Sequence, residues 1–150
     1  ITLGYNYRMT DVQAALGISQ LRKLDWVLRK KQEAAEYYTE LLLDIESVQP
    51  PYVMQGVSHT YMFYTLKILD ENLRDRVMQH LNKNGVETRI AFPSVHLQPF
   101  YRSLYGYKEG YLPVTEECSK RVLSLPIYPH ILRDDQKFIV ETVVEEVRRR

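Results

Sequence analysis

The sequence predicts an α+β domain in which a small, three-stranded sheet is covered by helices on one face. Two observations favour this class. Helical and strand patterns alternate along the 150 residues, in the order helix, strand, helix, strand, helix, strand, helix. The last helical segment also has a single apolar stripe with helical spacing. Alternating elements that each have one apolar side are typical of a sheet with helices packed on it. The stripe consists of Val140, Val143, Val144 and Val147.

The first helical segment is long. Thr10 is a predicted N-cap, and Gln13 three residues later completes a T-x-x-Q capping box. Helical spacing of apolar residues continues to about residue 44, with a bend or restart near residues 26–31, before Pro50-Pro51 ends the segment. Because apolar residues occupy more than one face, we expect this helix to link two domains or to pack against a partner.

The rest of the chain is divided by Pro, Gly, Asn and Asp residues. The run TYMFYTLKIL at residues 60–69 is rich in aromatic and β-branched residues and predicts a strand. Asp70 then caps a helix that Asn84-Gly85 ends. The remaining predicted elements are a strand at 86–92, a loop or short helix at 96–107, a helix at 113–121, a strand at 122–125 and a last helix after Asp134-Asp135.

Composition excludes several classes of function. The net charge of +1 gives no basic field for nucleic acid. The single cysteine, Cys118, excludes an internal disulfide and suits a reducing compartment. No apolar run approaches the roughly 20 residues of a membrane span. We therefore expect a cytoplasmic protein without nucleic-acid or membrane partners. The histidines lack the spacing of metal ligands, so no metal site is predicted; they are His59, His80, His96 and His130.

Polar side chains precede the first helix. Tyr5, Asn6, Tyr7 and Arg8 lie just before Thr10, where free backbone N–H groups and the helix dipole favour an anion. Amide and guanidinium donors suit a phosphate or a carboxylate. The alternative is a structural turn, in which Asn6 bonds its own backbone and Arg8 pairs with a carboxylate. The residues alone leave both interpretations open.

Two further polar clusters follow predicted strands. Arg89, His96 and Tyr101 lie at and after the end of the strand at 86–92, which is a common place for binding residues. The alternative for His96 is a structural histidine that satisfies local backbone groups, and the sequence alone favours it. The third cluster, LPIYPH at residues 125–130, more often forms a rigid packed turn than a site.

Four motifs resemble the DegT/DnrJ/EryC1/StrS aminotransferase family, in the order that the family has them. The resemblance implies a pyridoxal-phosphate (PLP) enzyme that aminates nucleotide-linked keto-sugars. The ETR at residues 87–89 is most similar to the perosamine-synthetase branch, although Ile90 stands where that branch has a proline. The motifs are GYNYRMTDVQAALGISQL, SHTYMFYTLKI, RIAFPSVHLQPFY and VLSLPIYPHI.

The family's architecture implies which part of such an enzyme this chain forms. Members have the fold-type-I architecture, with a large domain followed by a small C-terminal α+β domain. The resemblance places residues 1–48 at the end of the large domain and in a long linking helix, and residues 49–150 in the small domain. The Schiff-base lysine lies upstream of the matching region, so we expect no catalytic residue here and no activity from this chain alone. The start at Ile1-Thr2 without Met agrees with this placement.

The resemblance also implies roles for individual residues. Asn6 and Arg8 match the residues that reach the PLP phosphate of the partner subunit in a homodimer. His96, Tyr101, Arg89 and Tyr5 match positions that face the nucleotide-sugar substrate. Glutamate is the amino donor typical of the family.

Three alternatives remain open from the sequence. Relatives with histidine in place of the lysine are sugar dehydratases, and the deciding position is outside this chain. A non-catalytic dimerisation or regulatory module is the second alternative. The third is an RNA-binding sheet, suggested by the aromatic residues 61–64 but disfavoured by the low net charge.

Overall fold

The computed structural model describes residues 3–5, 7–90 and 92–149. The chain begins with α1 (Asp11–Leu21), which has the predicted capping box: Thr10 Oγ1 accepts from Gln13 N at 3.3 Å, and Gln13 Oε1 accepts from Thr10 N at 2.9 Å. The helix does not continue as predicted. It ends in a turn at residues 22–23, where Lys23 N donates to Gln20 O. The expected restart near residues 26–31 is therefore wrong, because the break comes earlier.

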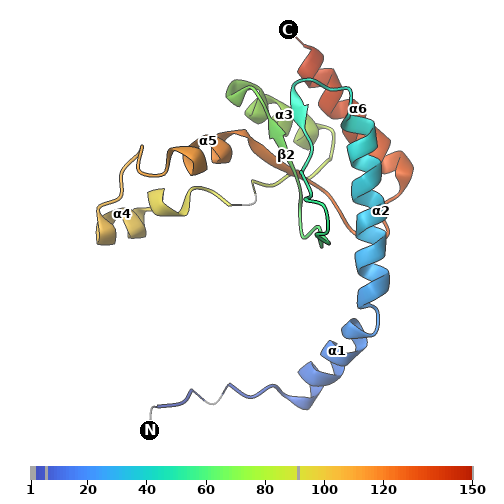
Figure 1. Cartoon of the computed structure of the whole chain (residues 1–150), viewed down its shortest axis with the longest axis vertical. Coiled ribbons are helices and arrows are strands. Elements are labelled where there is room, and N and C mark those ends of the chain that lie inside the picture. Colours follow the sequence, from blue (N-terminus) through green and yellow to red (C-terminus); the bar gives the residue numbers. More distant parts are fainter. Residues whose placement is uncertain (1–2, 6, 91, 150) are drawn as a thin grey trace.

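A second helix, α2 (Leu24–Leu42), follows this turn and packs into the core with Tyr38 and Leu42 fully buried. Figure 1 shows α1 angled away from α2, at the opposite end of the molecule from the sheet. No residue of α1 is buried among those that the structure describes. The predicted long helix is thus two helices, of which only the second belongs to the packed core.

The sheet has three antiparallel strands in the order β1-β2-β3. The strands are β1 (Val48–Gln49), β2 (Tyr64–Ile68) and β3 (Val122–Leu125), so the predicted α+β class and the number of strands are confirmed. One predicted strand is wrong. The chain at 86–92 makes only an isolated bridge, between Arg89 and Ser124, and the third strand is the two-residue β1 instead. Pro93, which has no N–H to donate, follows soon after this bridge.

Helices α2, α3 (Glu71–Lys83) and α6 (Arg133–Arg148) supply the core that covers one face of the sheet. The alternate residues Tyr64, Leu66 and Ile68 of β2 are fully buried on that face, as the period of two requires. The opposite face keeps the half-buried Thr65 and Lys67. The sheet is therefore one-sided, with its polar face turned toward the segment that leads back into β3.

That segment is an arm, residues 93–121, which extends from the sheet (Figure 1). It contains the 3-10 helix η1 (Val95–Leu97) and the short α4 (Pro99–Tyr105), and it returns along α5 (Pro113–Arg121), which passes into β3 without a loop. The predicted helix at 113–121 is confirmed. Cys118 lies half-buried in α5. None of the described helices is long and apolar enough to cross a membrane.

Candidate functional site

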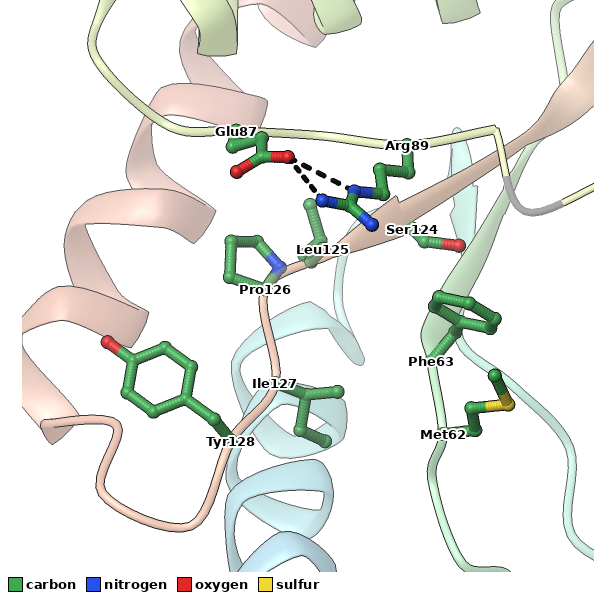
Figure 2. A pocket seen from close by; sticks show the side chains of 9 residues that line it. All are labelled: Met62, Phe63, Glu87, Arg89, Ser124, Leu125, Pro126, Ile127 and Tyr128. Carbon is green, nitrogen blue, oxygen red and sulfur yellow. Dashed lines mark hydrogen bonds and ion pairs between the residues drawn. The ribbon is translucent and has the colours of Figure 1, made fainter.

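A pocket with a volume of about 310 Å³ lies at one edge of the sheet. Three segments that are distant in sequence build it: the entry to β2, the stretch after α3, and the exit from β3 (Figure 2). Its size is at the lower end of ligand-binding cavities, and its wall is mostly apolar with a few polar groups. The lining residues are Met62, Phe63, Glu87, Arg89, Ser124, Leu125, Pro126, Ile127 and Tyr128.

Arg89 is held to the sheet by its backbone. Its N–H donates to Ser124 O at 3.2 Å, and Ser124 N donates to Arg89 O at 2.8 Å. The side chain is free of the sheet and pairs with Glu87: Nε and Nη2 lie 3.1 and 2.8 Å from Glu87 Oε1. The Ser124 hydroxyl bonds Thr65 Oγ1 at 2.9 Å. Among the residues that line the pocket, Arg89 supplies the cationic group, and Figure 2 shows its guanidinium between Glu87 and Ser124.

The entry to β2 passes through an unusual backbone conformation. Tyr61 has a φ of 47°, in the left-handed region that costs a non-glycine residue roughly 1–2 kcal/mol. Its N–H donates to His59 Nδ1 at 2.9 Å, and the two rings lie 4.3 Å apart. The next two residues, Met62 and Phe63, line the pocket. Strain of this kind persists where the surroundings enforce it, often at functional sites.

His96 lies in η1 with only 7% of its surface exposed. Its Nε2 is 2.9 Å from Glu116 Oε1, and because an ionised carboxylate can only accept, Nε2 donates. Glu116 also accepts from Gly110 N at 2.9 and 3.0 Å and from Leu112 N at 3.2 Å. The Gly110 and His96 donors lower the pKa of Glu116. In this chain His96 thus ties the start of the arm to its return, and its predicted contact with substrate stays a prediction.

Tyr101 lies on α4, at the end of the arm, where its ring contacts Phe100 and Tyr105 at centroid distances of 5.4 and 6.3 Å. Aromatic contacts continue from Tyr105 to Tyr107 and from Tyr107 to Tyr111. The described pocket lining includes Arg89 but neither His96 nor Tyr101. The structure therefore places the predicted substrate residues in three places: Arg89 in the pocket, His96 and Tyr101 in the arm, and Tyr5 before α1.

The N-terminal polar cluster lies elsewhere again. Asn6 lies outside the described residues. Tyr5 and Tyr7 are exposed, with their rings stacked 5.6 Å apart. Arg8 is exposed beside the start of α1, and none of the ion pairs found between described residues includes it. Figure 1 shows the described residues that precede α1 far from the sheet and the arm.

The residues around Arg8 fit a phosphate group. The first turn of α1 presents backbone N–H groups beside an exposed guanidinium, and its capping box uses the N–H groups of Thr10 and Gln13 but not those of Asp11 and Val12. A guanidinium makes strong, paired hydrogen bonds to phosphate oxygens. Arg8 and the start of α1 are therefore compatible with a phosphate group, and the predicted contact of Asn6 and Arg8 with a cofactor stays a prediction.

Sequence reasoning missed two carboxylates and one pocket wall. Glu116 follows Pro113 by three residues, and an acidic residue in the first turn of a proline-initiated helix was a usable signal. Glu87 lies two residues before the predicted site residue Arg89, but its pairing with Arg89 was not predicted. The third cluster is a packed turn, as favoured, since Pro126 O accepts from Tyr38 OH at 3.1 Å. Its Tyr128 nevertheless lines the pocket.

Comparison with known proteins identifies the family. Residues 1–144 match the model of the DegT/DnrJ/EryC1/StrS aminotransferase family, and the chain belongs to this family. Solved structures with a similar fold include the PLP and PMP forms of Spr1654 from Streptococcus pneumoniae, each with a TM-score of 0.90 at 20% identity. The expected perosamine-synthase resemblance is also found: GDP-perosamine synthase of Escherichia coli O157:H7 is 31% identical over 143 residues, which cover 95% of this chain and 38% of that protein.

Two further relatives extend the comparison. The pleiotropic regulatory protein of Geobacillus stearothermophilus is 36% identical over 150 residues, covering 97% of this chain and 39% of that protein. The solved structure of S. venezuelae DesV has a TM-score of 0.91 at 30% identity, covering 99% of this chain and 39% of that one. The chain thus spans about two fifths of the length of the relatives it matches.

Proposed function

We propose that the whole protein carrying this chain is a PLP-dependent aminotransferase that transfers an amino group from a donor such as glutamate to a nucleotide-linked keto-sugar. The family match over residues 1–144 is the observation that carries this proposal. The overlay on DesV along 99% of the chain supports it.

In this proposal residues 1–48 form the end of the large domain and the linking helices, and residues 49–150 form the small domain. The break at residues 22–23 separates the unburied α1 from the packed α2. The boundary of the small domain lies between residues 48 and 49 in this proposal. Tyr38 and Leu42 of α2 pack in the same hydrophobic core as β2, so α2 contacts the small domain directly. The cofactor's lysine lies outside the chain, so the chain alone is inactive. The whole protein acts as a homodimer.

In this proposal the residues of this chain bind and orient the cofactor and the substrate. When bound, PLP supplies the electron sink that lets the amino group move between carbon skeletons. Asn6 and Arg8 hold its phosphate in the neighbouring subunit, because an amide and a guanidinium beside a helix N-terminus suit a dianion. Arg89 binds an anionic part of a substrate from the pocket. His96, Tyr101 and Tyr5 complete the substrate side of the site.

The test uses the full-length protein and its Arg8→Ala variant. We expect the wild type to bind PLP, seen by its visible absorbance, and to convert a GDP-linked 4-keto-sugar and glutamate into an amino sugar, seen by mass spectrometry. Loss of Arg8 removes charge-assisted hydrogen bonds to the phosphate, so the affinity for PLP should fall roughly tenfold. The matched control is Arg22→Ala, which removes an exposed arginine from the other end of α1.

Three outcomes contradict this proposal. Unchanged PLP affinity in Arg8→Ala removes the phosphate role. Loss of water from the sugar instead of amination assigns the protein to the dehydratases. Visible absorbance from this chain alone with PLP would contradict its inactivity.

A non-catalytic regulatory module is the second candidate, and the name of the G. stearothermophilus relative favours it. A full-length protein that binds no PLP and converts no keto-sugar would support this candidate over the aminotransferase.

A further inference from the structure

The Arg89 guanidinium in the pocket is already paired with a carboxylate of the same chain, that of Glu87. Glu87 and Arg89 are two residues apart in an extended segment, so their side chains lie on the same side. Thr88 between them bonds Asn82 Oδ1 at 3.2 Å, at the end of α3. The carboxylate and the guanidinium therefore meet over the pocket wall formed by Leu125 and Pro126 (Figure 2).

The ion pair between Glu87 and Arg89 can separate at little energetic cost. The side chains of Arg89 and Glu87 are 68% and 75% exposed, and such exposed pairs contribute little to stability because water and salt screen them. By contrast, the backbone of Arg89 is fixed by two hydrogen bonds to Ser124. The guanidinium can exchange its partner while its anchor stays in place, and within the described segments no second carboxylate is paired with it.

A ligand anion entering the pocket must displace Glu87. A guanidinium presents a planar fork that one carboxylate or phosphate fills, so the internal and the external anion compete for the same donors. Glu87 also repels an incoming anion by its own charge. The apolar wall formed by Phe63, Leu125 and Ile127 offers no replacement for the lost charge pair.

We propose that Glu87 is an internal surrogate for a substrate oxyanion: it holds the Arg89 guanidinium in position before substrate binds and sets the affinity for the substrate that displaces it. This rests on the proposed function, in which the oxyanion is either a carboxylate of the amino donor or a phosphate of the nucleotide-sugar. Glu87 is thus a specificity-determining residue that opposes binding.

The test measures equilibrium binding to the full-length protein by calorimetry, with glutamate and GDP as separate probes. Glu87→Gln keeps the size of the side chain but removes its charge, so one probe should bind about two- to fivefold more tightly, as expected for loss of a competing exposed ion pair. The probe that gains identifies the source of the oxyanion. The matched control is Glu40→Gln, which removes an exposed carboxylate from α2 outside the pocket.

A double-variant cycle isolates the coupling. Arg89→Gln should weaken binding of the same probe, and Glu87→Gln added to it should give no further gain, because the two residues act through one contact. Unchanged or weaker binding of both probes in Glu87→Gln, or an equal gain in the Arg89→Gln background, overturns the proposal. The binding measurement does not depend on turnover. If the full-length protein transfers no amino group but Glu87→Gln still binds one probe more tightly, the role of Glu87 stands and the proposed function is rejected.

Discussion

At the scale of single residues, Glu116 holds more of the arm together than any predicted site residue. One carboxylate accepts from the side chain of His96 and from the backbones of Gly110 and Leu112. These contacts join η1, the loop after α4 and the first turn of α5. Because charged acceptors make stronger hydrogen bonds than neutral ones, the arm depends on Glu116 being ionised.

Glu116→Gln should destabilise the chain in a pH-dependent way. The folded-state pKa of Glu116 is lowered, so its stabilisation is complete above the usual glutamate pKa of about 4.3 and is lost as the pH falls through the lower folded-state value. The free energy of unfolding of the wild type should exceed that of the variant at pH 7, and the gap should close toward acid. Urea unfolding at several pH values measures this.

Glu109→Gln is the control for that series, since it removes an exposed carboxylate from the same arm. A gap between wild type and Glu116→Gln that stays constant from pH 7 to pH 3 would contradict the assigned role of ionised Glu116.

At the scale of elements, stability is concentrated in the helices and strands around the core. Leu81 on α3 is fully buried, whereas Leu104 on α4 is 58% exposed. Leu81→Ala should lower the free energy of unfolding by about 2–5 kcal/mol, because it removes buried apolar surface and leaves a cavity. Leu104→Ala, as control, should change it by less than about 0.5 kcal/mol. Equal effects in urea unfolding would show that α4 is part of the core.

Elements with local signals could be predicted from the sequence. Helix α3 begins after Asp70, whose Oδ1 accepts from Asn72 N at 2.9 Å, and ends before Gly85, whose φ is 79°. Both signals lie within a few residues of the helix end. The strands of the sheet were harder to predict, because a strand forms only where a partner strand, distant in sequence, pairs with it. The two residues of β1 are too short for a visible pattern, and the strand-like 86–92 makes only one bridge.

The candidate site was predictable only in part, for the same reason. Arg89 could be predicted as a candidate because it lies near the end of the predicted strand at 86–92. The pocket around it depends on the register of β2 and β3, in which Tyr64 pairs with Leu125. This register brings residues 62–63 close to residues 125–128, and nothing local in either segment indicates it.

At the scale of the whole molecule, α1 and the described residues before it are separate from the packed core. Leu16, Ile18 and Leu21 on α1 are exposed. Exposed apolar patches mark surfaces that contact other proteins or domains. In the chain alone, α1 is an 11-residue helix without tertiary packing, and helices of this length are marginal in water.

Deleting residues 1–23 should therefore leave the core intact. We expect the free energy of unfolding of residues 24–150 to differ by less than about 0.5 kcal/mol from that of the complete chain, because none of the described residues removed is buried. Urea unfolding followed by near-ultraviolet circular dichroism measures the core. A loss of several kcal/mol would show that α1 packs on the core in solution.

The bridge between Arg89 and Ser124 has a consequence for how members of such a family diverge. The arm leaves the sheet just after Arg89 and returns just before Ser124, and two hydrogen bonds join these points. A segment whose two ends are held together in this way can be lengthened at small entropic cost, because the entropy of loop closure depends only weakly on loop length. Substitutions, insertions and deletions in the tyrosine-rich end of the arm are therefore expected to leave the sheet, the core and the position of Arg89 unchanged.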